Sequence, residues 1–184
     1  ACAAVFDADK VLLVDPSYRW FGVPHKKFTV MNDLKAAADY LSQCDDIRLR
    51  RIAVKLAPES AYARFKLATR YVAQKQWEEA RAELPAVERL DSVGALAYCL
   101  KAALALHERK LDETVEFSQK ALEHGWPVHD SGVHMILGNA FAQQGRMKEA
   151  REAFRTALRR SPEENSAQAA RRAIARINEK IGNE

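Results

Sequence analysis

Two aspartates one residue apart, Asp7 and Asp9, directly follow a short apolar run near the start of the chain. Carboxylates can act as nucleophiles and as general acids or bases in enzymes. These two aspartates are therefore a candidate for such chemistry. The same residues also suit a polar turn between the β-prone runs at residues 3–6 and 11–14, which involves no catalysis.

A second group of side chains could bind a metal ion. Histidine and aspartate are common ligands of Zn²⁺, and four of them gather around a Gly-Trp-Pro segment, as His124, His129, Asp130 and His134. The histidine intervals of five residues differ from the three or four that place two side chains on one face of a helix. We therefore predict no metal-ligating residue in this group. We also predict no catalytic or cofactor-binding residue in the rest of the sequence.

A repeated four-residue motif indicates the secondary-structure elements that must position these side chains. It occurs at intervals of 34 and then 36 residues, as WEEA at 77–80, LDET at 111–114 and MKEA at 147–150. A period near 34 is typical of stacked helix pairs. Apolar residues recur at steps of three and four with breakers between them, which predicts helices at about 60–74, 77–90, 94–108, 111–124, 130–143 and 147–160.

Small and apolar residues recur in the same register. The aligned sets are Ala68, Ala102 and Gly138; Tyr71, Ala105 and Phe141; Leu84, Ser118 and Phe154; and Val87, Ala121 and Ala157, followed by Pro162. Over roughly residues 59–164 this pattern resembles the tetratricopeptide repeat family, and the third copy matches it best. The second copy departs from it at Lys101, Thr114 and Ser118. The resemblance implies an all-α fold, a right-handed superhelical stack of antiparallel helix pairs.

The flanking segments predict four parts in all. Residues 1–30 fit no repeat and are expected to be an irregular segment with short strands. Residues 31–58 predict a degenerate helix pair, at about 31–43 and 46–57. Three repeats follow at 59–164, and a helix at 165–184 would cap the stack, because its charged residues fall largely off its apolar face.

The amino-acid composition limits the classes of protein to which the chain can belong. The 184 residues are 48% hydrophobic and 29% charged, with a net charge of +4, which suits one elongated helical domain. Basic and acidic residues are interspersed, so we expect no nucleic-acid partner. No apolar run approaches the roughly 20 residues of a membrane span.

The cysteines bear on the compartment. Cys2, Cys44 and Cys99 show no metal-ligand spacing and are expected to be free thiols, which favours the cytoplasm. An Ala-Cys start also fits a processed lipoprotein, which would be periplasmic or lipid-anchored. The strand-like beginning without an initiator Met suggests a chain begun midway.

The family resemblance implies a partner-binding surface. In such a stack the first helix of each pair lines the inner face, and the residues expected to bind a partner there are Phe65, Thr69, Leu96, Leu100, Leu106, Met135, Ile136 and Asn139. Family members that clamp a C-terminal carboxylate use Lys, Asn and Arg, whereas the matching positions here hold Phe65, Thr69, Leu100, Gly132 and Ile136. A carboxylate clamp is not expected, because a buried carboxylate needs cationic or amide donors.

These observations favour a non-enzymatic adaptor, which binds a peptide or helix of a partner protein in an apolar concave groove and assists complex assembly. Two other arrangements remain open for the groove, namely docking of the N-terminal segment and homo-oligomerisation. The alternative function is a regulatory or assembly module of a larger enzyme or biosynthetic complex. A remote alternative is a phosphatase, since the segment around Asp7 and Asp9 resembles the nucleophile motif of haloacid-dehalogenase-like phosphatases. Phosphatases of that family need a doubly wound sheet that carries Mg²⁺, whereas nearly all of the sequence after residue 30 predicts helix.

Overall fold

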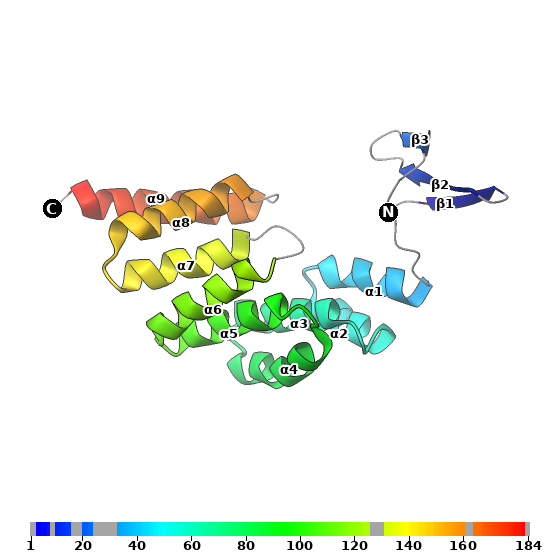
Figure 1. The fold of residues 1–184 in the computed structure, drawn as a ribbon, viewed down its shortest axis with the longest axis horizontal. Coiled ribbons are helices and arrows are strands. Elements are labelled where there is room, and N and C mark those ends of the chain that lie inside the picture. Colours follow the sequence, from blue (N-terminus) through cyan, green and yellow to red (C-terminus); the bar gives the residue numbers. More distant parts are fainter. Residues whose placement is uncertain are drawn as a thin grey trace. The chain divides into compact units, whose positions relative to one another are not determined.

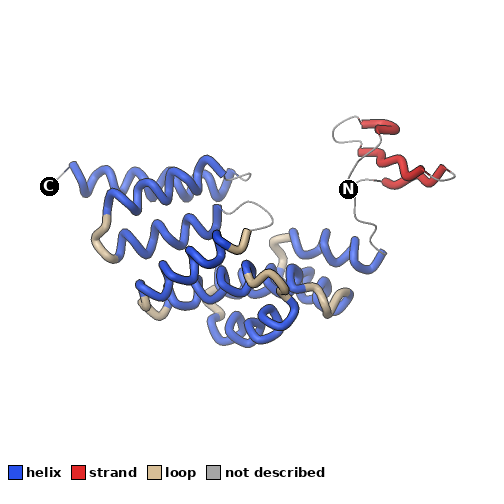
Figure 2. The backbone as a smooth tube through the Cα atoms, viewed as in Figure 1, coloured by secondary structure: helices blue, strands red, loops and turns tan. Residues whose placement is uncertain are grey.

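The computed structural model describes residues 3–7, 10–15, 20–23, 33–125, 131–160 and 164–182, with side chains for 34–125, 131–160 and 166–180. The chain divides into two compact units, Ala1–Asp33 and Leu34–Glu184 (Figures 1 and 2). None of the helices in the described ranges combines the length and apolar composition that crossing a bilayer requires.

The first unit contains a small antiparallel sheet (red in Figure 2). Its strands are β1 (Ala3–Asp7), β2 (Lys10–Asp15) and β3 (Trp20–Val23), paired in the order β1-β2-β3. The predicted strand-like runs are thus confirmed as β1 and β2, whereas β3 was not predicted. Asp7 ends β1 opposite Lys10. The described strands pair antiparallel, whereas the phosphatase alternative depends on a doubly wound sheet. Asp9 lies outside the described residues.

The second unit is built from helices that follow one another along the stack in Figure 1. The helices are α1 (Asp33–Gln43), α2 (Ile47–Leu56), α3 (Ala61–Ala73), α4 (Trp77–Leu90), α5 (Ala95–His107), α6 (Leu111–Glu123), α7 (Ser131–Gln143), α8 (Met147–Arg160) and α9 (Glu164–Gly182). Their ends agree with the predicted ranges to within one or two residues. Helices α3 and α4, α5 and α6, and α7 and α8 pack as pairs, and α3 also contacts α5, which contacts α7.

Local side chains explain where several helices begin. Asp46 caps α2 by accepting from the backbone N–H of Arg48 at 2.8 Å. Ser60 caps α3 by accepting from the N–H of Ala63 at 3.1 Å. These oxygens satisfy backbone donors that have no partner within the helix.

The turn inside each helix pair has the same geometry three times. Lys75, Arg109 and Gly145 all have positive φ, at 60°, 60° and 78°. The next residue donates its N–H back to the carbonyl of the residue five positions earlier, as in Gln76 to Tyr71 at 2.9 Å. The equivalent bonds join Lys110 to Ala105 and Arg146 to Phe141. This left-handed helix ending fixes the reversal into the second helix of each pair.

Equivalent positions of the repeats form the core. The set Ala53, Val87, Ala121 and Ala157 is at most 1% exposed, as are Ala80, Thr114 and Ala150. In the third pair a Cβ added to Gly138 would lie 2.5 Å from Cε1 of Phe154, so the aromatic ring occupies the space that a side chain at position 138 of α7 would need.

At the end of the stack, α9 buries Ala167, Ala170 and Ile177. It exposes Arg171, Arg172, Arg176 and Lys180, which suits a capping helix.

Gly138→Ala should destabilise the fold by about 1–3 kcal/mol, because the new methyl group overpacks against Phe154. The matched control is Gly132→Ala in the same helix, where an added Cβ meets nothing within 4 Å. That control should stabilise the fold by about 1 kcal/mol through helix propensity alone. Urea unfolding measures both, and equal effects at the two glycines would contradict the close approach of α7 and α8.

The turn residues make a second prediction. Lys75→Gly and Arg109→Gly should each stabilise the chain by about 1 kcal/mol, because glycine adopts positive φ without the Cβ clash of other residues. Gly145→Ala should cost a similar amount. Thermal unfolding of the three variants gives the sign, and a loss of stability in Lys75→Gly would rule out this explanation of the turns.

Candidate interaction face

The structure buries three of the predicted partner-binding residues. Phe65 on α3 and Leu96 and Leu100 on α5 are 5%, 6% and 1% exposed and belong to the main core cluster with Leu104 and Val133. The prediction that these three side chains line an open apolar groove is therefore wrong, because they are buried. Because the first helices contact one another directly, large apolar residues at these positions fill the contacts between neighbouring pairs.

The other five predicted residues reach the surface. Leu106, Met135 and Ile136 are half-buried, Thr69 is half-buried and Asn139 is exposed. On α7, Asn139 lies three and four positions after Ile136 and Met135, which places the three on one side of the helix. We call the surface formed by Thr69, Leu106, Met135, Ile136 and Asn139 the first-helix face. It belongs to α3, α5 and α7.

Two side chains on this surface have defined packing or bonding. The hydroxyl of Thr69 donates to the carbonyl of Lys66 at 2.9 Å, so it is already engaged with its own helix. Ile136 packs against the main core cluster, and Met135 packs against a second cluster that includes Phe154 and Ile177. Asn139 is exposed and Thr69 is half-buried, so Asn139 is the more accessible of the two polar side chains on this face.

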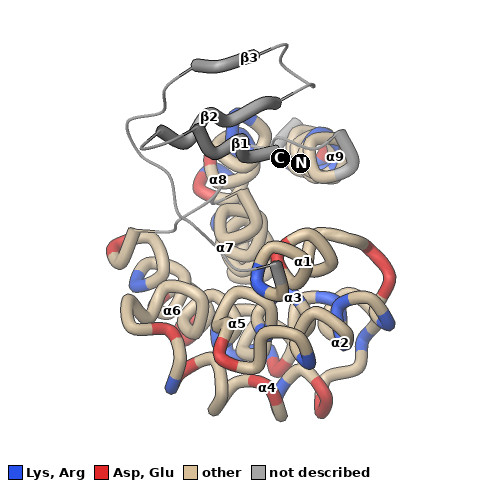
Figure 3. The backbone as a smooth tube through the Cα atoms, turned by 90° about the vertical axis from the view of Figure 1, so that its right-hand side faces the viewer, with Lys and Arg blue, Asp and Glu red and all other residues tan. Residues whose placement is uncertain are grey.

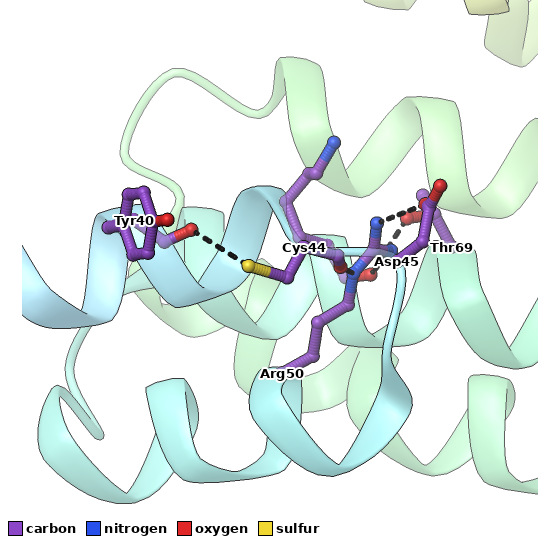
Figure 4. Close-up of polar contacts among 6 residues, drawn as sticks. Tyr40, Cys44, Asp45, Arg50 and Thr69 are labelled. Atoms are coloured by element: carbon purple, nitrogen blue, oxygen red, sulfur yellow. Dashed lines mark hydrogen bonds and ion pairs between the residues drawn. The ribbon is translucent and has the colours of Figure 1, made fainter. Parts of the chain in front are cut away.

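A buried arginine joins the degenerate first pair to the repeats (Figure 4). Arg50 on α2 is 6% exposed and donates from Nε to the carbonyl of Cys44 at 2.7 Å and from Nη1 to the carbonyl of Lys66 at 2.6 Å. Its Nη2 lies 3.4 Å from a carboxylate oxygen of Asp45. Burial lowers the pKa of Arg50, and the nearby Asp45 carboxylate partly opposes that shift.

Sequence reasoning missed Arg50, although the repeat register contains a signal for it. Arg50 stands 34 residues before Leu84, at the position that Leu84, Ser118 and Phe154 fill in the repeats. A charged residue at a core position indicates a buried hydrogen-bonded role, because an unpaired buried charge is costly.

Lys101, an unusual residue of the second repeat, contacts the first repeat. Lys101, which replaces a usual Leu, forms an ion pair with Glu88 of α4 at 2.6 Å, and its ammonium lies 5.6 Å from the ring centre of Tyr98. Trp77 of α4 stacks on His107 of α5, with ring centres 3.7 Å apart. The ion pair and the ring stack both join α4 of the first repeat to α5 of the second.

The residues with catalytic or metal-binding types do not converge in the described part of the chain. His124 stacks against Tyr98 at 5.3 Å, whereas His129 and Asp130 lie outside the described residues. Within the described ranges no three His, Cys, Asp or Glu side chains are placed to share a metal ion. Cys44 and Cys99 are free thiols, and burial raises the pKa of Cys99 to about 12, so this thiol is not a ready nucleophile.

Comparisons with known proteins agree with this geometry. The family model of the tetratricopeptide repeat matches residues 131–164. The "Protein STIP1 homolog" of Dictyostelium discoideum is 31% identical over 97 residues, which is 50% of this chain but 17% of that protein. The chain therefore spans a small part of that relative's length.

A solved structure has the same fold. The pilF protein of Pseudomonas aeruginosa superimposes with a TM-score of 0.58 at 18% identity, over 83% of this chain and 72% of that one. YrrB, described as a tetratricopeptide repeat protein with an unusual peptide-binding site, gives a TM-score of 0.48 at 16% identity over 82% and 77% of the two chains.

Proteins of this fold are protein-interaction scaffolds in general and are generally non-catalytic. The recurring turn, the buried small residues at equivalent positions and the matched segment together show that residues 131–164 are a tetratricopeptide repeat and that the described helices have the fold of a tetratricopeptide repeat array.

Proposed function

We propose that this chain is an adaptor that binds a peptide or helix of a partner protein on the first-helix face and so assists the assembly of a larger complex. The observation that supports this most is the exposed amide of Asn139 beside the half-buried apolar side chains of Met135 and Ile136. An amide can pair with the backbone of a bound segment, while apolar neighbours bury its side chains.

The size of the apolar surface limits what it contributes. Fully burying a Leu, Ile or Met side chain contributes about 1.5–3 kcal/mol, and Leu106, Met135 and Ile136 are already half-buried. Together they would then contribute about 3 kcal/mol, whereas micromolar affinity requires about 8 kcal/mol. The contact must therefore extend along the neighbouring first helices, with backbone hydrogen bonds adding to the apolar contacts.

The face does not suit a carboxylate clamp. Of the positions that carry donors in clamp proteins, Phe65 and Leu100 are buried and apolar, while Thr69 donates its hydroxyl to its own helix. A terminal carboxylate would find too few donors there to replace its lost hydration. The partner segment is therefore expected to bind through internal residues.

Peptides selected from a random display library on the full 184-residue chain test the proposal. Asn139→Arg introduces a bulky cation into the first-helix face and should weaken most selected peptides at least tenfold. Asn139 is exposed, so the fold should survive the change. The matched control is Gln119→Arg, an exposed amide on α6, which should leave affinity unchanged.

A second pair of variants tests the apolar part. Ile136→Asp on α7 and Leu122→Asp on α6 alter partly buried residues of the same core cluster, so their folding costs should be similar. Binding, measured by fluorescence anisotropy on protein that melts cooperatively, should fall only for Ile136→Asp. Equal binding by Asn139→Arg and the unchanged chain, together with equal losses in the two aspartate variants, would remove the first-helix face as the binding surface.

A further inference from the structure

Charged residues are distributed unequally along the array. Helices α4 and α6 together contain 3 basic and 8 acidic residues, whereas α8 and α9 together contain 9 basic and 4 acidic residues. Figure 3 shows the charged residues along the helices by colour. The last two helices therefore carry an excess of 5 basic residues, which is more than the net charge of +4 on the whole chain.

Three cations form a row along α9. Arg172, Arg176 and Lys180 are exposed and follow one another at intervals of four residues, which places them on one side of the helix. At a rise of 1.5 Å per residue, neighbouring members are about 6 Å apart along the axis and the row covers about 12 Å. The side of α9 that packs into the array is a different one, where Ala170 and Ile177 are buried. We call the row of three cations the α9 basic stripe.

The α9 basic stripe lacks the local neutralisation that cations on α8 have. Arg155 and Arg159 of α8 both lie within ion-pair distance of Glu152, at 3.8 Å and 3.2 Å. No member of the stripe forms an ion pair or a hydrogen bond within the described ranges of the chain. Among the described side chains of α9 the single carboxylate is that of Glu179, so positive charge predominates on this side of the helix.

The repeat register shows that the stripe does not suit a further helix of the array. Helix α9 packs on α7 and α8, in the place that the first helix of a fourth pair would take. Arg172 stands 34 residues after Gly138, at the position where the repeats carry Ala68, Ala102 and Gly138. In the third pair this position meets the ring of Phe154 on the second helix. A long cationic side chain there prevents a second helix from packing at the separation seen in the repeats.

We propose that the α9 basic stripe binds an acidic helix of a partner protein, whose carboxylates recur at every fourth position and lie opposite the three cations. A helix with this spacing repeats every 6 Å or so, as the stripe does. Guanidinium groups suit the partner's carboxylates because they can donate two parallel hydrogen bonds to each. These residues are not part of the first-helix face, so this inference goes beyond the proposed function and does not depend on it.

Two other anionic partners fit the stripe less well. Proteins that bind single-stranded nucleic acid without sequence preference stack the bases on aromatic side chains, and residues 166–180 of α9 include no aromatic residue. A helix that lies on a membrane inserts large apolar side chains into the lipid. The isoleucines Ile174 and Ile177 of α9 pack instead against the cluster that contains Phe154.

Binding of a synthetic acidic helix to the full 184-residue chain tests the proposal. The probe is a labelled peptide with Glu at every fourth position, held helical by a hydrocarbon staple on its opposite side, and fluorescence anisotropy at low salt gives its affinity. The double variant Arg172→Glu, Arg176→Glu should weaken binding about tenfold, because two exposed ion pairs are replaced by repulsion. The difference should shrink as salt is raised. A peptide with Gln in place of Glu should show the same loss on the unchanged chain.

The matched control is Lys55→Glu, Arg89→Glu, which changes the net charge equally at exposed positions of α2 and α4 and should leave affinity unchanged. All four substituted residues are exposed, so both double variants should melt like the unchanged chain. Equal affinities of the two double variants, or of the Glu and Gln peptides, would overturn the assignment of the acidic helix to α9. Tighter binding of a single-stranded oligonucleotide or of phosphatidylserine vesicles, lost in the α9 double variant, would overturn the choice of a protein partner.

Discussion

The close approach of the two helices in each pair is the constraint on which the structure depends. In the third pair the ring of Phe154 occupies the space beside Gly138. The residues aligned with Gly138 in the other pairs, Ala68 and Ala102, are also small and fully buried. Apolar burial between paired helices stabilises the unit only at that separation, since dispersion contacts weaken within an ångström. The repeated left-handed turn brings the helices together, and the small residues allow them to meet.

This packing also determines what remains at the surface. The first helices contact one another along the stack, so the side chains of Phe65, Leu96 and Leu100 are buried in the contacts between helix pairs. The accessible part of the face is consequently smaller and more polar than an apolar groove. It consists of Thr69 on α3, Leu106 at the end of α5, and Met135, Ile136 and Asn139 in the middle of α7.

Periodicity and the breakers between apolar runs predicted nearly all helix boundaries, because those signals are local. The caps that the structure shows are local too, since Ser60 and Asp46 act within three residues of themselves. The repeat register likewise predicted the burial of Val87, Ala121 and Ala157. It failed for Leu96 and Leu100, because their exposure depends on the distance between α3, α5 and α7, which no local pattern encodes. Strand β3 was missed for a similar reason, since its short run pairs with β2 across a register shift. Arg50 could have been noticed as a charge in a core position, but its carbonyl partners follow only from coordinates.

The bond from Arg50 to position 66 joins a side chain of α2 to a backbone atom of α3. Arg50 contacts the backbone carbonyl there, an atom that every amino acid supplies, so the junction between the first pair and the repeats does not depend on which side chain α3 presents. The bond itself is therefore independent of the amino acid at position 66, and the junction is held by backbone geometry rather than by a particular side chain of α3.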